Sequence, residues 1–379
     1  MTCGLIISVR CDIAVLKPPV NLPDCYQQRA NCFEVIPQLE HATSPMASER
    51  TPESAATAGE PTVLVVLINY CTPDLTIDCL RSLEGEVARY PGSSVVVADN
   101  ASPDGSGAAV ARVIEENGWH AWARLLALPR NGGFAYGNNA VVREQLESSS
   151  PPSYVWLLNT DTLVRPGALH ALVAFLQKNP FAGIVGSRLE HEDGSRQCSA
   201  FRFPSIGGEL ESSSQIGIIS RLMKAWAVAP QLPDEPRKFD WLSGASMLVR
   251  TTVFQSVGLM DEGYFLYYEE TDFCRRAKTA SWSCWYVPQS RVVHLVGKST
   301  GVTDFNRRTK RRPSYWFQSR RRYFIKHHGF VYALMADLAL AVGTLLSKLR
   351  STLKGQRAAE PRRFLRDLAR HSALWDRYD

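Results

Sequence analysis

Short, continuous runs of apolar residues recur along the chain, and stretches with helical spacing separate them. Three such runs are rich in β-branched and aromatic residues, which predicts strands covered on both faces: Val63–Asn69, Ser94–Asn100 and Tyr154–Asp161. Helices are predicted from Pro73 to Leu83 and from Pro166 to Leu176, because proline favours the first helical turn and apolar residues follow it on one face. Strands that alternate with helices indicate right-handed βαβ crossovers and an α/β fold with a mostly parallel, Rossmann-like sheet flanked by helices.

The second half of the chain predicts further elements of both kinds. Strands are expected at Trp241–Arg250 and Cys284–Val293. TTVFQSVG indicates a short helix that ends at Gly258, and YYEETDFCRRAK indicates the start of another helix with acids in its first turn. The stretch from Ser205 to Arg237 shows no clear period, and we interpret it as a variable insertion.

Composition changes near both ends of the chain. Residues 36–61 are rich in Pro, Ser, Ala, Thr and Glu, which is typical of poorly ordered segments. We therefore predict an N-terminal extension (1–60), an α/β domain (61–305) and a basic, amphipathic helical C-terminal region (306–379). The opening residues lack a basic start, and Arg10 and Asp12 interrupt their apolar run, so we predict no secretory signal. The nine cysteines include no CxxC pair, which argues against a disulfide framework and fits a cytoplasmic chain.

The C-terminal region joins a basic block to an apolar segment. Nine Lys and Arg side chains and no acid occur between Arg307 and Lys326, which favours an anionic partner such as lipid headgroups, a pyrophosphate or nucleic acid. The following segment, Gly329–Leu349, is almost entirely apolar apart from Asp337. Because an acid is costly in the middle of a membrane span, we predict a helix that lies in the membrane interface. A buried helix and a spanning helix are the alternatives.

Polar residues end the first three predicted strands. Parallel sheets bind ligands beyond the carboxyl ends of their strands, so Asn69, Asp99 and Asp161 should share one rim. Asp99 and Asn100 are placed to bond a ribose or a base, and an Asx turn is the alternative interpretation. The sequence contains no GxGxxG after the first strand and no GxxxxGK[ST], which argues against dinucleotide dehydrogenases and P-loop enzymes.

A glycine-rich segment, NGGFAYGNN, runs from Asn131 into a helix that we expect to begin near Asn138. Small residues allow a backbone to approach a ligand closely, and the first amides of a helix can face a phosphate. A tight turn with close helix–strand packing is the alternative.

Carboxylates gather at two further places. Asp161 could hold Mg²⁺ or Mn²⁺ while a diphosphate supplies other ligands, or it could cap the next turn. Glu269, Glu270 and Asp272 lie between apolar flanks, where crowded acids raise one another's pKa as a general base requires; exposed acids in a first helical turn are the alternative. His294 ends the last strand, as a metal ligand, a phosphate contact or a structural residue.

Taken together, these segments resemble the family 2 glycosyltransferases of GT-A fold, and among them the bacterial rhamnosyltransferase-like branch. The resemblance extends from about Pro61 to Lys326. It rests on seven segments in a fixed order: VVLINYCTPD, VVVADNASPDGS, NGGFAYGNN, LLNTD, WLSGASMLVR, GLMDEGYFLYYEETDFCRRA and the strand that leads to His294.

The resemblance implies an inverting, metal-dependent transfer of a sugar, with rhamnose favoured, in the synthesis of bacterial cell-surface polysaccharides. The base of the nucleotide would lie at Asp99. In the DxD-like position Asn159 replaces the first acid, so Asp161 would hold the metal, with His294 as a helper. Glu270 is the favoured catalytic base, with Glu269 and Asp272 as the other candidates. The implied contacts to the nucleotide sugar are Asn69, Asp99, Asn100, Asn131, Gly132, Gly133, Gly137, Asn138, Asn159 and Gly244.

The resemblance also implies partners and a location. We expect dTDP-rhamnose as the donor, with UDP-sugars as the alternative, and a lipid-linked or polysaccharide acceptor. The enzyme would be peripheral on the cytoplasmic face of the plasma membrane, on an anionic lipid surface. Two other functions are weighed against this one: a nucleotidyltransferase-like enzyme, and a nucleic-acid-binding module that uses the basic C-terminal region. No nucleic acid partner is expected.

Overall fold

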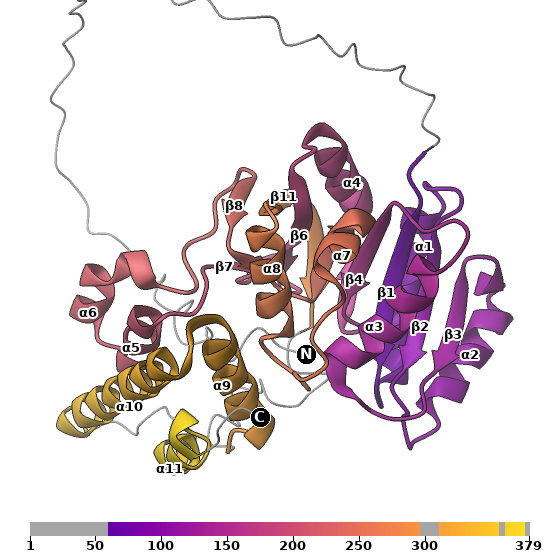
Figure 1. Ribbon diagram of the computed structural model, residues 1–379. Helices are drawn as coiled ribbons and strands as arrows, with labels where there is room; N and C mark the ends of the chain where they lie inside the picture. The colour runs from indigo at the N-terminus through magenta and orange to yellow at the C-terminus, as the bar shows by residue number, and fades with distance from the viewer. Residues whose placement is uncertain (1–59, 296–310, 356–360, 376–379) are drawn as a thin grey trace, which may run out of the picture. The chain divides into compact units, whose positions relative to one another are not determined.

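A computed structural model of the chain describes residues 60–295, 311–355 and 361–375 (Figure 1). The predicted N-terminal extension lies outside these residues except for Glu60. The predicted domain boundary between residues 305 and 306 also lies outside them.

A nine-stranded mixed sheet forms the centre of the α/β domain. Its order is β3-β2-β1-β4-β10-β6-β11-β5, and β8 pairs with β11. The strands are β1 (Val63–Asn69), β2 (Ser94–Asp99), β3 (Ala123–Ala127), β4 (Tyr154–Leu158), β5 (Thr162–Val164), β6 (Ala182–Glu190), β8 (Arg237–Phe239), β10 (Ser246–Arg250) and β11 (Ser283–His294). The first four strands pair in parallel, and β10 lies antiparallel between β4 and β6. The predicted α/β fold with a mostly parallel sheet is confirmed.

Helices cover both faces of this sheet (Figure 1). Alternate residues of β1 belong to two separate hydrophobic clusters: Leu64, Val66 and Ile68 to one, and Val63, Val65 and Leu67 to the other. The first cluster includes residues of α3 (Gly133–Leu146), α7 (Thr251–Val257) and α8 (Glu269–Thr279). The second includes residues of α1 (Pro73–Val87), α2 (Ser106–Glu116) and α4 (Ala168–Lys178). Burial on both faces explains why β1 reads as a continuous apolar run.

Two predicted elements differ from the structure in ways that shape the rim. The strand predicted at Trp241–Arg250 is interrupted: β9 (Trp241–Leu242) pairs with β7 (Ala200–Phe201) in a small second sheet, and only β10 joins the central sheet. The break at residues 243–245 places Gly244 in a turn. The predicted start of α3 near Asn138 is wrong, because the helix begins five residues earlier at Gly133.

The poorly patterned stretch of 205–237 is helical in large part. It forms α5 (Ile206–Ser214), α6 (Gly217–Leu222) and the 3₁₀ turn η4 (Lys224–Trp226). The Ser205 hydroxyl caps α5 by accepting a hydrogen bond from the Gly208 amide at 3.1 Å.

Three further helices form the C-terminal region: α9 (Ser314–His328), α10 (Phe330–Leu353) and α11 (Phe364–Arg370), followed by the 3₁₀ turn η6 (Ala373–Trp375). The buried face of α10 packs on α5, where Gly343 comes so close that a Cβ would lie 3.0 Å from the Leu210 carbonyl oxygen. Asp337 points into the protein and pairs with Arg320 at 2.5 Å. The acid that interrupts the apolar segment is therefore not directed at the exposed face of α10.

Candidate functional site

The rim of β1 and β2 carries a fixed polar network. Asn69 and Asp99 lie side by side in the strand register, and the Asn69 Nδ2 donates to Asp99 Oδ1 at 2.6 Å. The Ser102 hydroxyl donates to the same oxygen at 2.6 Å, and the Ser102 amide donates to Oδ2 at 3.1 Å. The Asx-type turn weighed from the sequence is thus present, and it holds the carboxylate at the end of the strand.

Asn100 ties the glycine-rich loop to the end of β2. Its side chain is fully buried, and its Nδ2 donates to Asn131 Oδ1 at 3.0 Å and to the Gly133 carbonyl at 3.1 Å. The Gly132 amide donates back to Asn100 Oδ1 at 3.4 Å. Asn100 and the NGG residues therefore form one structural unit beside Asp99.

The same loop packs directly on the segment that leads into the acidic helix. Gly133 has a φ of +88°, and a Cβ at this position would lie 1.9 Å from the carbonyl oxygen of Phe265. The Phe134 amide donates to that oxygen at 3.0 Å. Only glycine satisfies both the backbone angle and the close approach. The signal was in the sequence as a conspicuous glycine pair, but its contact with Phe265 could not be inferred from spacing.

Gly137 and Asn138 lie inside α3. A Cβ at Gly137 would meet the side chain of Ile68 at 3.0 Å, so this glycine allows α3 to pack closely on β1. Asn138 is buried, and its Nδ2 donates to the Phe134 carbonyl at 2.9 Å. These two contacts correspond to the packing alternative that was weighed from the sequence.

The three acids of α8 are all buried, but their surroundings differ. Asp272 accepts from Arg276 Nε at 2.8 Å and lies 2.7 Å from both Lys326 Nζ and His327 Nε2. Burial opposes its ionisation, yet the hydrogen bonds from His327, Lys326 and Arg276 outweigh burial and hold the pKa of Asp272 well below its usual range. Asp272 is therefore an ionised centre that ties α8 to α9.

Glu269 and Glu270 lie in a much less polar environment. Burial raises the pKa of Glu270 to about 7, although a hydrogen bond from the Gly244 amide opposes the rise. Burial and the neighbouring Glu270 carboxyl raise the pKa of Glu269 well above its usual range. Within the described residues, the Oε2 atoms of both side chains have no hydrogen-bond partner. A carboxylate with a near-neutral pKa and an available oxygen suits proton transfer.

The third part of the site is the loop after β4. The Asn159 amide donates to the Ala245 carbonyl at 3.1 Å, which places this loop beside the turn of Gly244. Asp161 is 1% exposed, and its Oδ1 lies 3.4 Å from His294 Nε2. Gln197, which sequence reasoning missed, positions the histidine: its Oε1 lies 3.3 Å from His294 Nδ1, and its Nε2 donates to the His294 carbonyl at 2.8 Å.

Asp161 and His294 offer a carboxylate oxygen and an imidazole nitrogen, which suit Mg²⁺ or Mn²⁺. Among the residues that the structure describes, no group of three or more His, Cys, Asp or Glu side chains is arranged to hold a metal ion. The pair therefore fits a cation only if a bound diphosphate and water complete its ligands.

These contacts join the predicted residues into one connected site. Asn100 holds the Gly133 loop, and that loop contacts the backbone of Phe265 just before α8. Gly244 contacts Glu270 and adjoins Ala245, which bonds the Asn159 loop. The rim of β1 and β2, the acidic start of α8 and the loop of Asn159 to Asp161, called the metal loop below, are therefore neighbours.

Backbone strain gathers at the same edge of the sheet. Seven non-glycine residues in the described ranges have positive φ, and four of them follow β1, follow β2 or directly precede α8: Cys71, Ala101, Tyr267 and Tyr268. Such strain costs about 1–3 kcal/mol per residue and concentrates at ligand-binding sites.

Comparison with known proteins gives a consistent family match. The sequence model of the family described as "Glycosyltransferase like family 2" matches residues 61–324, a range that contains all seven motif segments. The N-acetylglucosaminyl-diphospho-decaprenol L-rhamnosyltransferase of Mycobacterium tuberculosis is 30% identical over 293 residues, which cover 74% of this chain and 85% of that protein. Rhamnosyltransferase WbbL of Escherichia coli K12 is 27% identical over 167 residues, which cover 43% of this chain and 61% of that protein.

Among solved structures, mannosyltransferase PcManGT from Pyrobaculum calidifontis, in complex with GDP-Man and Mn²⁺, aligns with a TM-score of 0.49 at 16% identity. The alignment covers 87% of this chain and 92% of that chain. A likeness at this level carries no functional argument.

Proposed function

Because the chain belongs to glycosyltransferase-like family 2, we propose that it moves a sugar from a nucleoside-diphosphate sugar to a saccharide acceptor with inversion at the anomeric carbon. The resemblance to the rhamnosyltransferase-like branch is confirmed by the relatives. The nucleotidyltransferase and nucleic-acid-binding alternatives find no support in the family match.

One observation carries the proposed mechanism: two buried carboxylates at the start of α8 lie between the glycine-rich loop and the metal loop. Of these two, Glu270 contacts the Gly244 amide and has a pKa near neutrality. We assign Glu270 as the general base that takes the proton from the acceptor hydroxyl. The hydroxyl oxygen then bonds to the anomeric carbon as the bond to the diphosphate oxygen breaks, and the nucleoside diphosphate leaves.

The other residues bind and orient the donor. Asp99, held by Asn69 and Ser102, presents its carboxylate edge to the base or ribose. The Asn100 and Gly133 unit shapes the wall between the nucleotide and the acids. Asp161 and His294 would hold the divalent cation, which would neutralise charge on the departing diphosphate when bound.

A melting-temperature screen tests the donor and metal sites without relying on turnover. A ligand present at a hundredfold excess over its Kd stabilises the folded state by about 2.7 kcal/mol, which corresponds to about 5 °C or more for a domain of this size. We expect dTDP with Mn²⁺ or Mg²⁺ to give the largest shift, UDP a smaller one, and dTDP alone the smallest.

In this screen, Asp161→Asn should abolish the additional shift in melting temperature that the metal provides. The shift that dTDP gives without metal should remain. Asp78→Asn, an exposed carboxylate on α1, is the matched control and should behave as wild type. A metal-dependent shift that survives Asp161→Asn would contradict the assigned metal site.

The acceptor is proposed to be lipid-linked, and α10 is proposed to lie in the membrane interface. Of the helices in the described ranges, α10 is the one whose length and composition would allow it to cross a membrane, and a third of its apolar window is buried. Its other face carries a row of exposed apolar side chains at spacings of three and four: Val331, Met335, Leu338, Val342, Leu345, Leu349 and Leu353. With Asp337 paired inside the protein, this face can enter the apolar edge of a lipid layer without burying a charge.

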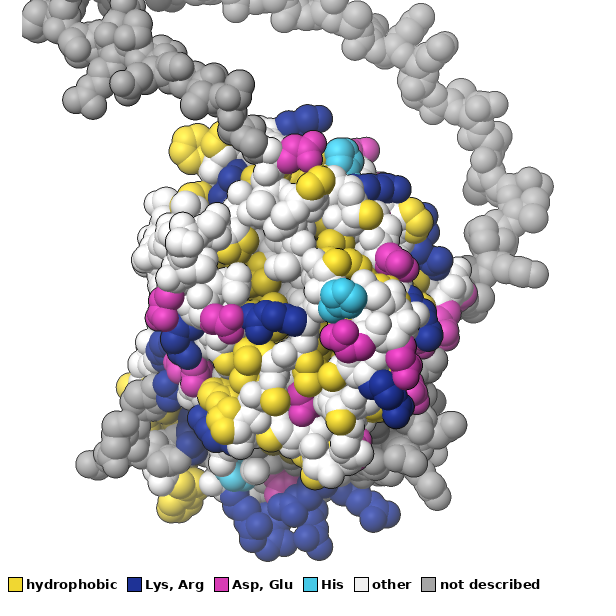
Figure 2. All heavy atoms as spheres, turned by 90° about the vertical axis from the view of Figure 1, so that its right-hand side faces the viewer, with side chains coloured by type: hydrophobic (Ala, Val, Ile, Leu, Met, Phe, Trp, Pro, Cys, Tyr) yellow, Lys and Arg dark blue, Asp and Glu magenta, His cyan; other side chains and the backbone are white. Residues whose placement is uncertain are grey.

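Basic residues are well placed to support this contact. Figure 2 shows Lys and Arg side chains gathered at the lower end of the face in view, whereas acidic and basic side chains mix over the rest of that face. Four exposed arginines lie on or next to α11: Arg362, Arg363, Arg366 and Arg370. Arginines beside an apolar helix favour anionic headgroups.

Flotation with vesicles that contain phosphatidylglycerol tests the role of α10. The double substitution Leu338→Glu and Leu345→Glu should weaken vesicle binding at least about tenfold, because two carboxylates would have to enter the apolar layer. Phe181→Glu, at an 83% exposed position elsewhere, is the control and should bind as wild type. High salt should release the wild-type protein from membranes, and retention after a carbonate wash would contradict a peripheral location.

A further inference from the structure

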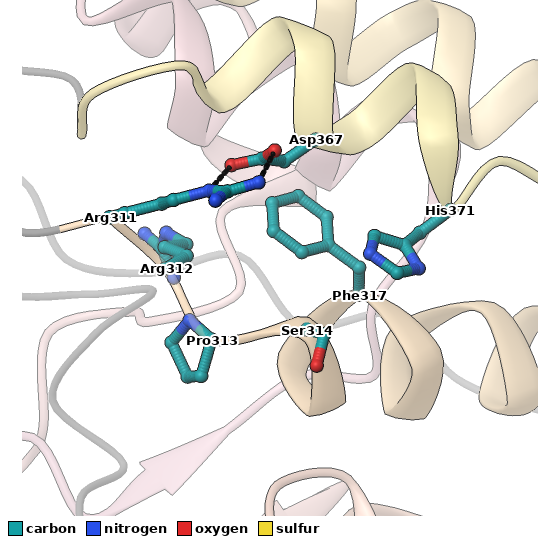
Figure 3. Close-up of a pocket in the computed structure, with 7 residues that line it drawn as sticks. All are labelled: Arg311, Arg312, Pro313, Ser314, Phe317, Asp367 and His371. Atoms are coloured by element: carbon teal, nitrogen blue, oxygen red, sulfur yellow. Dashed lines mark hydrogen bonds and ion pairs between the residues drawn. The ribbon is translucent and has the colours of Figure 1, made fainter.

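The C-terminal region contains a cavity of about 340 Å³ that none of the roles above uses. It is lined by Arg311, Arg312, Pro313, Ser314, Phe317, Asp367 and His371 (Figure 3). These side chains come from the three residues before α9, from the first turn of α9, and from α11 with the residue that follows it.

The lining carries positive charge in excess. Arg311 bonds Asp367 in a two-point pair, with Nε to Oδ2 at 2.7 Å and Nη2 to Oδ1 at 2.6 Å, so the one acid of the lining is neutralised (Figure 3). Arg312 provides a second guanidinium group. Burial lowers the pKa of His371, so its neutral ring can donate one hydrogen bond near pH 7.

Arg312 is held in place by aromatic rings. Its guanidinium carbon lies 4.4 Å from the ring centre of Trp316 and 5.5 Å from that of Phe364. These contacts fix a guanidinium group at the wall of the cavity, where it can bond an anion.

The start of α9 also favours an anion. This helix has 15 residues and begins at Ser314 after Pro313, and no side chain of the described residues caps its first turn. The Trp316 amide donates to the Pro313 carbonyl at 3.2 Å, but the positive end of the helix dipole still lies at the cavity, which Ser314 lines, and favours phosphate groups.

Residues at the cavity contact both the segment before α8 and helix α10. Tyr315, next to the cavity, stacks on Tyr267 at 6.1 Å, and Tyr267 is two residues before Glu269. Phe317 and Phe364 belong to the same hydrophobic cluster as Leu340 of α10, and Tyr267 and Tyr315 pack against that cluster.

We propose that this cavity binds the diphosphate group of a lipid-linked acceptor, so that the hydrocarbon chain continues into the lipid beside α10 and the saccharide extends toward Glu270. The choice of acceptor rests on the proposed function. The recognised chemistry is a diphosphate, which could also be supplied by free pyrophosphate.

Calorimetric titration with farnesyl diphosphate, a short prenyl diphosphate, tests the proposal. The protein is first saturated with dTDP and Mn²⁺ so that the donor site is filled. Wild-type protein should bind farnesyl diphosphate and should not bind farnesol measurably. Inorganic pyrophosphate should bind at least about tenfold more weakly, because it lacks the first part of the chain, which would contact Phe317 where the chain leaves the cavity.

Two variants alter the cavity in different ways. Arg312→Gln removes a cation and should weaken binding of farnesyl diphosphate about tenfold or more. Ser314→Asp places a negative charge at an exposed first-turn position where acids stabilise helices, so the fold should be retained while the anion is repelled. Arg112→Gln removes an exposed arginine of α2, outside the cavity, and should bind as wild type.

Wild-type affinity in both cavity variants would overturn the proposal, as would equal affinity for pyrophosphate and farnesyl diphosphate. The dTDP shift in melting temperature must stay unchanged in each variant, which separates the cavity from the donor site. If dTDP itself fails to bind wild-type protein, the proposed donor is wrong, whereas the titration still reports on the cavity.

Discussion

Glu270→Gln is expected to lower turnover about 10³-fold and, at the same time, to raise the melting temperature at pH 8. The loss of turnover follows from removal of the general base, whose contribution is about 10²–10⁴-fold. The gain in stability follows from burial: raising the pKa of Glu270 from 4.5 to about 7 costs the folded state about 3 kcal/mol once the carboxyl is ionised.

The direction of the pH dependence follows from the raised pKa. The stability cost is absent below the unfolded pKa, grows as the pH rises toward 7, and is constant above it. Wild type and Glu270→Gln should therefore melt alike near pH 4 and diverge by pH 8. The wild-type kcat/KM should rise through pH 7 and level off above it, because only the ionised carboxylate can accept a proton.

Glu269→Gln is the matched control, since it changes the neighbouring buried carboxyl in the same way. We expect it also to gain stability at pH 8 but to keep turnover within about tenfold of wild type. Turnover near the wild-type rate in Glu270→Gln, together with its loss in Glu269→Gln, would transfer the role of base to Glu269.

Asp272→Asn is expected to destabilise the protein by about 3–5 kcal/mol, the usual cost of breaking a buried ion pair from one side. The substitution leaves Arg276, Lys326 and His327 around a neutral amide. Urea unfolding at pH 7 measures the loss, and Asp74→Asn is the control, because Asp74 is an exposed acid in the first turn of α1.

The depressed pKa of Asp272 sets the pH range of this effect. Its contribution is present above the ordinary carboxyl pKa near 4 and is lost as the pH falls below that value, so wild type and variant should converge in acid. The folded fraction should retain most of its turnover, because Asp272 is assigned a positioning role. A variant that is as stable as wild type but inactive would instead place Asp272 in the chemistry.

The sequence predicted the parts of this protein that are governed by local pattern. The bounds of β1 agree with the structure, because a strand buried on both faces leaves an uninterrupted apolar run. The shared rim of Asn69 and Asp99 follows from parallel pairing alone. Gly258 ends α7 with a positive φ, as expected for a glycine after the last helical residue.

Features that depend on distant contacts were not predictable. The start of α3 at Gly133 depends on the carbonyl of Phe265, which lies 132 residues further along the chain. The opposite pKa shifts of Glu270 and Asp272 depend on α9, because Lys326 and His327 of that helix contact Asp272. Gln197 carried no recognisable signal, because its contact with His294 arises only when β11 folds beside β6.

The ion pairs of Asp272 also bear on where the working enzyme ends. The segment matched by the family model stops at residue 324, yet Lys326 and His327, two of the three basic side chains that contact this carboxylate, follow it. A truncated protein cut at that border would keep every rim residue but leave Asp272 with Arg276 as the remaining one of these three partners. Part of what holds the acidic helix in place is thus supplied by residues that follow the segment matched by the family model.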